Sequence, residues 1–242
     1  MNTLNREESN IAIAEWVTCC GNYTMIKSLI PTNQVFSFDA EEIDWVIRAN
    51  KNTEFSTHIG VYKSQLIAIL HPLDADGYEI VMDTYPYSPL QELKEDLRLV
   101  ETEKYTIVKN AVLSKELRKI DDNSDMFLPV SNKPVLPQDK AVTAIEAWRD
   151  EAMDWFYKEC EESKGNGIFK KFYTPSQDLK HSDKQLSYII CSFGLKFSDV
   201  YQRMLPTLIF ISFYKDTANT GSLEKISNTY DWSTVCPPRC QL

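Results

Sequence analysis

Residues 137–165, PQDKAVTAIEAWRDEAMDWFYKECEESKG, form the longest uninterrupted helical pattern in the chain. Apolar residues recur there at steps of three and four positions, so they share one side of a helix: Val142, Ile145, Trp148, Ala152, Trp155, Phe156 and Cys160. Pro137 suits a first helical turn, and Gly165 can take the left-handed conformation that ends a helix. The pattern predicts a central helix near 138–164, with both tryptophans in the core rather than on a ligand shelf, because indole rings bury large areas.

Strand-like segments lie on both sides of this helix. Residues 57–71 predict a β-hairpin that turns at Lys63 and Ser64. Apolar residues occupy both faces of its two arms, so we expect the hairpin inside a sheet. The segments after the helix that indicate strands are 168–174, 186–197 and 207–214. These patterns predict an α+β protein: a mixed or mostly antiparallel sheet built from β-hairpins, packed by the long helix and by three or four shorter helices.

Three shorter helices are predicted before the long one, at 11–23, 39–50 and 89–100. Asp39 and Glu42 have the spacing of a capping box, which starts the second of them. Ser88 as cap and Pro89 as first helical residue start the third. A short strand at 78–82 is expected just before it.

We expect residues 1–242 to form a single compact unit. An acidic turn and three prolines lie between residues 121 and 137, and this segment is the best place for a domain boundary. The alternative is therefore two subdomains, 1–122 and 138–242, joined by the proline-rich segment. Residues 231–242 show no periodicity, which predicts an irregular tail.

Composition excludes some classes of function. The 242 residues carry a net charge of −9 and contain no basic patch with interleaved aromatic residues. Nucleic acid is therefore not an expected partner, because neutralising phosphates needs clustered Lys and Arg. Only 7 glycines are present, and neither the dinucleotide-binding glycine pattern nor the P-loop pattern occurs.

The sequence also lacks the signals of a membrane-spanning or secreted protein. The longest apolar run, residues 204–214, is far shorter than the about 20 residues that a membrane-spanning helix needs. The first ten residues are polar and lack the pattern of a signal peptide. The 6 cysteines do not form a dense disulfide framework. We therefore expect no membrane association and a cytoplasmic location.

His58 and His71 form the first candidate site. If the hairpin turns at Lys63 and Ser64, both histidines project from one face as diagonal neighbours, roughly 6–8 Å apart at Cβ. A carboxylate from the next turn would complete a two-histidine, one-carboxylate set for a divalent metal ion, and we name Asp74 as that ligand. The carboxylates available are Asp74, Asp76, Glu79 and Asp83. A register shift of one residue would separate the histidines, and hydrogen-bonded structural histidines are the alternative.

Cys236 and Cys240 form the second candidate site, in the sequence Cys-Pro-Pro-Arg-Cys. The three-residue spacing differs from that of a redox Cys-x-x-Cys motif. Three interpretations stay open: an extended tail with incidental thiols, a disulfide or reversible thiol switch, and half of a zinc site. The zinc site would need two further ligands, such as Cys160, Cys191 or His181.

Four features together resemble uncharacterised proteins of Bacteroidetes-type bacteria. They are the hairpin sequence His58-Ile-Gly-Val with its Leu-Ile-x-Ile arm, the helix with Trp148 and Trp155, the segment Phe193-Gly194-Leu195, and the terminal Cys-Pro-Pro-x-Cys. Several of those bacterial proteins also end in such a Cys-Pro-Pro-x-Cys segment. The resemblance implies a bacterial, cytosolic α+β protein and brings no activity with it.

Because no catalytic motif is present and the chain is acidic, we expect a non-enzymatic interaction or accessory protein with a protein partner. Two alternatives remain. The first is a metal-dependent enzyme that uses His58 and His71. The second is a thiol-based redox sensor that uses Cys236 and Cys240. No cofactor is predicted beyond the divalent metal of the first alternative.

Overall fold

The computed structural model describes residues 1–93, 138–176, 186–214, 226–230 and 234–238, together with short strands at 106–108, 112–113, 119–121 and 126–128. The α+β fold class is confirmed: the strands are antiparallel, and the described helices are one long helix and three shorter ones. The helices are α1 (Arg6–Cys19), α2 (Tyr23–Leu29), α3 (Ala40–Ala49) and α4 (Gln138–Ser163).

Most strands belong to two sheets. The six-stranded sheet has the order β1 (Thr3–Asn5), β5 (Thr84–Pro89), β4 (Gln65–His71), β3 (Glu54–Tyr62), β10 (Lys171–Pro175), β14 (Thr234–Cys236). The four-stranded sheet has the order β13 (Ile226–Tyr230), β12 (Arg203–Tyr214), β11 (Leu186–Ser198), β2 (Phe36–Asp39). Two small ribbons pair β6 (Thr106–Val108) with β9 (Met126–Leu128), and β7 (Val112–Leu113) with β8 (Lys119–Asp121). Each of the two larger sheets therefore combines strands from both sides of residues 121–137, and the segment 231–242 contributes β14.

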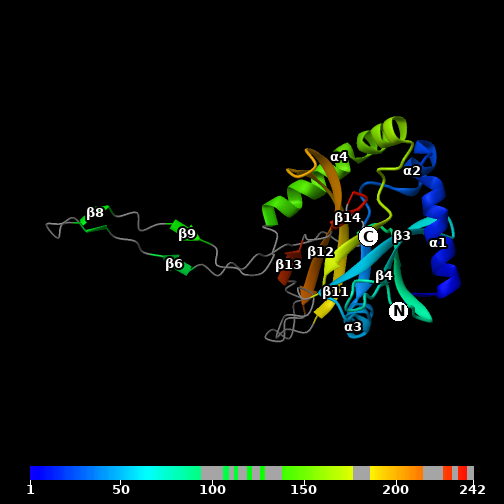
Figure 1. Ribbon diagram of the computed structural model, residues 1–242, viewed down its shortest axis with the longest axis horizontal. Coiled ribbons are helices and arrows are strands. Elements are labelled where there is room, and N and C mark those ends of the chain that lie inside the picture. The colour runs from blue at the N-terminus through cyan, green and yellow to red at the C-terminus, as the bar shows by residue number, and fades with distance from the viewer. Residues whose placement is uncertain are drawn as a thin grey trace.

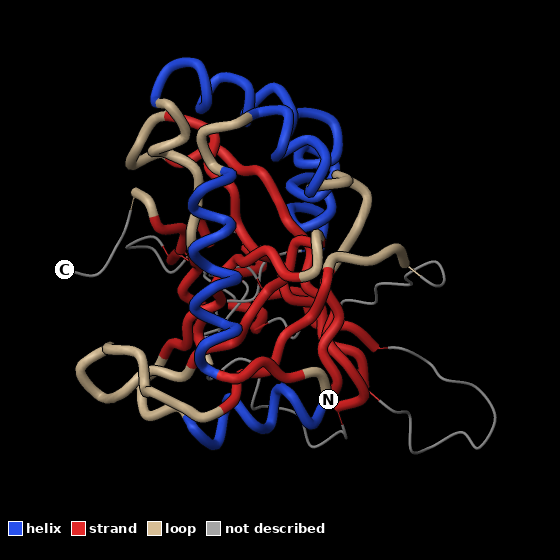
Figure 2. The backbone as a smooth tube through the Cα atoms, turned by 90° about the vertical axis from the view of Figure 1, so that its right-hand side faces the viewer, coloured by secondary structure: helices blue, strands red, loops and turns tan. Residues whose placement is uncertain are grey.

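The main core lies where the two sheets meet. Phe55 of the six-stranded sheet contacts Phe210 of the four-stranded sheet, with ring centroids 6.1 Å apart. Phe172 and Phe193 make a second contact between the sheets. Helix α4 packs along β11, and α1 packs against β3 (Figures 1 and 2). Both helices also add side chains to this core, which contains Trp16 of α1 and Trp148 and Trp155 of α4.

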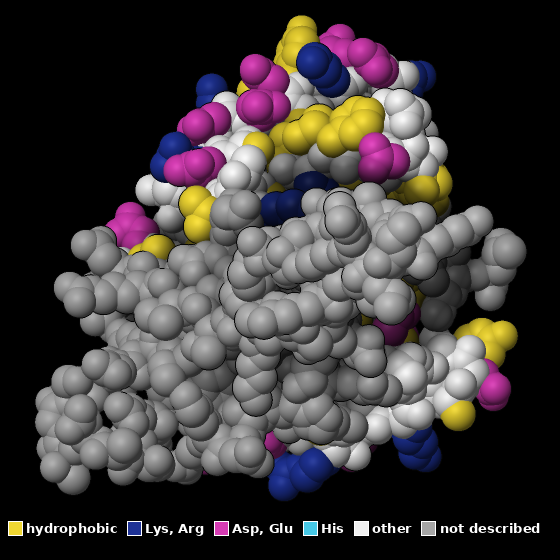
Figure 3. All heavy atoms as spheres, turned by 90° about the vertical axis from the view of Figure 1, so that its left-hand side faces the viewer, with side chains coloured by type: hydrophobic (Ala, Val, Ile, Leu, Met, Phe, Trp, Pro, Cys, Tyr) yellow, Lys and Arg dark blue, Asp and Glu magenta, His cyan; other side chains and the backbone are white. Residues whose placement is uncertain are grey.

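Helix α4 has the predicted role. Trp148 is 1% exposed and stacks on Phe193, with ring centroids 4.6 Å apart. Trp155 also packs in this core, and its Nε1–H donates to the carbonyl of Met204. The opposite side of α4 is exposed and acidic, and Asp and Glu side chains gather in the upper part of the face shown in Figure 3.

Two sequence signals were confirmed in detail. Asp39 and Glu42 form the capping box at the start of α3. The β3–β4 hairpin turns at Lys63 and Ser64, which have φ angles of 50° and 62°. Two consecutive positive φ angles give the tight turn whose twist matches that of the strands. β3 lies between β4 and β10, so the hairpin is inside a sheet as expected.

Three predicted elements were wrong or shifted. Residues 84–89 form strand β5, so no helix begins at Ser88, and the rest of the predicted 89–100 helix from residue 94 lies outside the described residues. The Ser88 hydroxyl, which would have capped that helix, accepts the N–H of Ser37 on β2. Residues 78–82 make only one bridge, from Glu79 to Leu73, instead of a strand.

The first helix is also displaced from its predicted range. α1 begins at Arg6 with Asn5 as its cap, and α2 is a separate helix. In the part of the chain that the structure describes, no helix is both long and apolar enough to span a lipid bilayer.

Candidate functional site

The candidate site lies on the face of the six-stranded sheet that points away from the four-stranded sheet. Side chains alternate between the two faces of a strand. Phe55 and Thr57 of β3 therefore point to the core, whereas Ser56 and His58 point to the other face. Helix α1 covers part of that face, and a Cβ atom added at Gly60 would lie 3.1 Å from Ala12. The loop between β4 and β5 covers the neighbouring part.

The hairpin register brings the two histidines together as predicted. Ser56 is opposite His71 and His58 is opposite Ile69, so His58 and His71 are diagonal neighbours on one face. Their ring centroids are 4.4 Å apart. Both side chains are largely buried, with 10% and 5% of their surface exposed.

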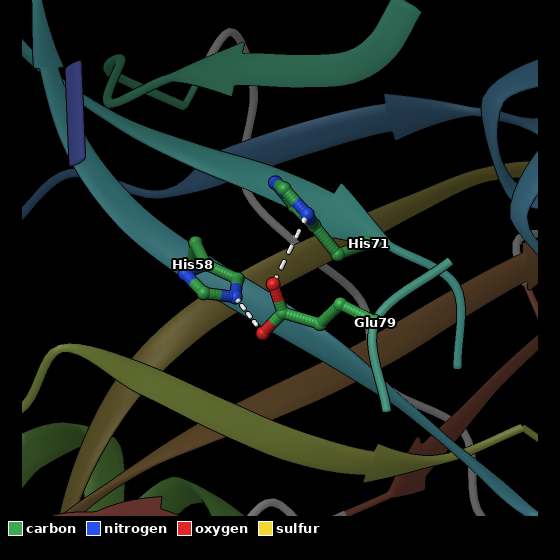
Figure 4. A group of neighbouring side chains, drawn as sticks. All are labelled: His58, His71 and Glu79. Carbon is green, nitrogen blue, oxygen red and sulfur yellow. Dashed lines mark hydrogen bonds and ion pairs between the residues drawn. The ribbon is translucent and has the colours of Figure 1, made fainter. Parts of the chain in front are cut away.

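Glu79 completes the group, where Asp74 had been predicted. Its two carboxylate oxygens face the two histidines (Figure 4). Oε1 lies 2.6 Å from Nε2 of His58, and Oε2 lies 3.7 Å from Nδ1 of His71. One ligand atom from each residue falls within 4.8 Å of the other two.

Asp74 has a different function in the same loop. Its Oδ1 accepts the backbone N–H groups of Asp76 and Tyr78, both at 2.9 Å. These bonds, with Gly77 at a φ of 88°, turn the chain back so that Glu79 pairs with Leu73. Asp74 therefore shapes the loop that carries Glu79 over the histidines and is not itself a member of the group.

Lys171 joins the group from β10. It is directly opposite His58, and its Nζ donates to Oε1 of Glu79 at 2.9 Å. The same Nζ lies 5.1 Å from the centre of the Tyr173 ring. Burial opposes the charge on Lys171, but its bonds to Tyr173 and Glu79 outweigh burial and raise its pKa.

The protonation states follow from these neighbours. Burial alone would raise the pKa of Glu79, but hydrogen bonds from His58 and Lys171 hold that pKa well below its usual range. Burial, reinforced by the nearby His58, lowers the pKa of His71 well below its usual value. At neutral pH the site therefore contains an ionised carboxylate and a neutral imidazole, which are the forms that bind metal ions.

The surroundings of His71 orient its ring. Its Nε2 lies 3.3 Å from the hydroxyl of Ser9 on α1. The Tyr85 ring stacks on it, with centroids 4.1 Å apart. A histidine that binds a metal usually donates its other ring N–H to a polar group, which fixes its tautomer. Ser9 is in the right place to accept from Nε2 when Nδ1 faces Glu79.

One cysteine of the second candidate site, Cys236, lies next to β10. Cys236 lies on β14, directly opposite Lys171, and it is disulfide-bonded. Cys19, Cys20, Cys160 and Cys191 are free thiols. Cys240 lies outside the described residues, as does His181, so the pairing of Cys236 with Cys240 and a thiol switch remain predictions. A zinc site at this pair would need the free thiolate of Cys236, which the disulfide removes.

Sequence reasoning did not find Lys171, Ser9 or Tyr85. Lys171 is at least a hundred residues from either histidine in sequence, and no motif marks it. Ser9 is a buried residue within α1, and no motif marks it either. Glu79 was named among the alternatives, and only the folded loop distinguishes it from Asp74.

No protein-family model, curated protein or solved structure matches this chain.

Proposed function

We propose that the protein binds a divalent transition-metal ion, with Zn²⁺ as the best fit, through His58, His71 and Glu79, and that it is a metal-dependent enzyme. The supporting observation is a set of distances: one nitrogen of each imidazole and one carboxylate oxygen all lie within 4.8 Å of one another. These ligand types suit Zn²⁺, which takes histidine nitrogen at about 2.0–2.1 Å and carboxylate oxygen at about 2.0–2.2 Å.

The number of ligands supports a catalytic role. Structural zinc sites usually have four protein ligands, whereas catalytic sites have three and leave one position for water or substrate. In the part of the chain that the structure describes, the group contains three such residues. Glu79 keeps 34% of its side-chain surface exposed, so solvent reaches the carboxylate. A bound ion there would activate its water or polarise a substrate.

Metal binding by purified protein tests the proposal. After chelator treatment and dialysis, calorimetry with Zn²⁺ should show one site per chain. His58→Ala and Glu79→Gln should each weaken binding by at least about 100-fold, because each removes a direct ligand. Asp76→Asn is the matched control, since it removes an exposed carboxylate of the same loop that is not a member of the group, and it should bind like the wild type.

The competing interpretation is a hydrogen-bonded network that only fastens the loop to the sheet. It predicts a wild-type stoichiometry near zero. Equal Zn²⁺ affinities for the wild type, His58→Ala and Glu79→Gln would also contradict the proposal, because binding would then lie elsewhere.

A second candidate function, binding a protein partner, is favoured by an exposed apolar patch at the β11–β12 turn. We call Phe197, Val200 and Tyr201 the turn patch; they are 54%, 84% and 45% exposed. The turn is anchored to α4, because Arg203 pairs with Glu159 at 3.1 Å and Trp155 donates to Met204. A fixed apolar patch of this kind is typical of a protein contact.

The charge around the turn patch indicates the partner. The turns of α4 next to it expose Asp154, Glu161 and Glu162, and the chain is acidic overall. We therefore propose a protein whose apolar contact surface is rimmed by Lys and Arg. The cytoplasmic location of the protein also remains a prediction.

Site-specific photo-crosslinking in cells tests this second proposal. A photoreactive phenylalanine at Val200 should give a discrete crosslinked species, and Phe197→Ser should abolish it. The same probe at Ile11, which is 59% exposed on α1, is the matched control. Identical crosslinking patterns at the two positions would contradict a specific partner at the turn patch.

A further inference from the structure

The sheet face that carries the two histidines also carries a buried polar group without a hydrogen-bond partner within the described structure. Ser56 is 0% exposed, and its hydroxyl has no hydrogen-bond partner within the described structure. It is two residues before His58 on β3, so both side chains are on the same face. His71 is its neighbour on β4, and Tyr173 is its neighbour on β10.

This orphan hydroxyl differs from the others that the structure contains. Thr57 and Thr174 also lack partners, but they alternate to the core face of the same sheet. Ser212 belongs to the other sheet. A buried hydroxyl without a partner is unfavourable, so a bound group that accepts or donates a hydrogen bond at Ser56 gains affinity.

Lys171 supplies a positive charge on the same sheet face as Ser56 and the histidines. Its ammonium is 2.9 Å from Glu79, and 23% of its side-chain surface is exposed. It is the direct cross-strand neighbour of His58, on the strand that also places Tyr173 next to Ser56. Without a metal ion, the charges of Lys171 and Glu79 balance.

A divalent ion would disturb this balance. Imidazoles that bind a metal ion are neutral, so Glu79, Lys171 and the ion would leave an excess of two positive charges beside the two buried histidines. Buried charge is costly unless it is paired. The ion would also bind the carboxylate of Glu79, which Lys171 contacts. The ammonium of Lys171 would then be available to another anion.

We propose that the metal-loaded site binds the oxyanion group of its ligand, a carboxylate or a phosphate, through Lys171 and Ser56. This inference rests on the metal site proposed above. The oxyanion would balance the excess charge, accept from the ammonium of Lys171 and pair the hydroxyl of Ser56. A small anionic substrate is therefore the chemical class that the site would take.

Visible absorption of Co²⁺-loaded protein tests the inference. Titration with inorganic phosphate, and separately with acetate, should give a saturable change in the Co²⁺ spectrum, and chloride at equal ionic strength should not. The two arms distinguish a phosphate site from a carboxylate site. Either anion supports the inference if Lys171→Met weakens its binding roughly 10- to 100-fold, as expected for the loss of a charge-assisted hydrogen bond.

Three variants complete the experiment. Ser56→Ala should weaken anion binding about 3- to 10-fold, the effect of one neutral hydrogen bond. Lys171→Arg keeps the charge and should retain the anion response. Lys158→Met removes an exposed lysine of α4 and should behave as the wild type. Co²⁺ binding is read in the same titration, so a variant that does not fold is recognised directly.

The outcomes separate the two proposals. If Co²⁺ does not bind the wild type, the metal site fails and this inference fails with it. If Co²⁺ binds but neither anion changes its spectrum, the metal site stands and the oxyanion inference is wrong. Unchanged anion affinity in Lys171→Met would likewise overturn it, with Lys171→Arg showing whether the position tolerates substitution.

Discussion

Trp148→Ala is expected to lower the free energy of unfolding by about 3–5 kcal/mol, as large-to-small changes of a buried aromatic residue do. Trp148 is almost completely buried at the centre of an aromatic cluster. It stacks on Phe193 at 4.6 Å and contacts Phe156 edge-on at 5.6 Å. The small side chain would leave a cavity between α4 and the sheets, which the rigid strands cannot close. Unfolding in urea, monitored by circular dichroism, measures the loss of unfolding free energy.

Two controls separate packing from other causes. Trp148→Phe keeps an aromatic ring and removes an indole N–H that has no partner within the described structure, so it should cost less than half as much. Tyr157→Ala removes a half-exposed aromatic residue of the same helix and should cost less than about 1 kcal/mol. A loss for Trp148→Ala no larger than that for Tyr157→Ala would show that α4 is not the central packing element.

Gly165→Ala is expected to destabilise the protein by about 3 kcal/mol or more, because two penalties add. Gly165 follows α4 with a φ of 78°, in the left-handed region that favours glycine. A Cβ atom there would lie 1.9 Å from the carbonyl oxygen of Cys20, at the end of α1. Backbone would have to move to make room. Chemical denaturation of the variant and the wild type gives the difference.

Gly21→Ala is the matched control for this prediction. Gly21 lies beside Gly165, but an added Cβ atom would be 3.4 Å from the nearest atom, the carbonyl oxygen of Lys164, which is an ordinary contact. Its substitution should change stability by less than about 1 kcal/mol. Equal effects at the two glycines would show that the close approach of α1 and α4 is not what requires Gly165.

Local patterns predicted the elements whose signals agree with their surroundings. The stripe of α4, the Asp39–Glu42 capping box and the turn at Lys63 and Ser64 each specify a conformation within a few residues. The hairpin register follows from that turn, so the neighbourhood of His58 and His71 could also be predicted.

Local signals failed where another segment competed for the same groups. Ser88 and Pro89 are a good helix start, but β4 and β1 pair with the backbone of β5, and Ser37 takes the Ser88 hydroxyl. Sheet pairing satisfies backbone groups over long sequence separations, which no local pattern shows. The helix over 89–100 was therefore predicted from a signal that the fold uses differently.

The sequence by itself determined the fold class, the central helix and the pairing of two histidines on one sheet face, because these depend on periodicity and turn geometry within about thirty residues. Only the tertiary structure decided which carboxylate faces the histidines and which cation balances it. Asp74 and Glu79 are equivalent in chemistry, and the hydrogen bonds that curl the loop select Glu79. Lys171 lies on β10, which follows the long helix in the chain. It reaches His58 through the pairing of β10 with β3, which no local sequence pattern encodes.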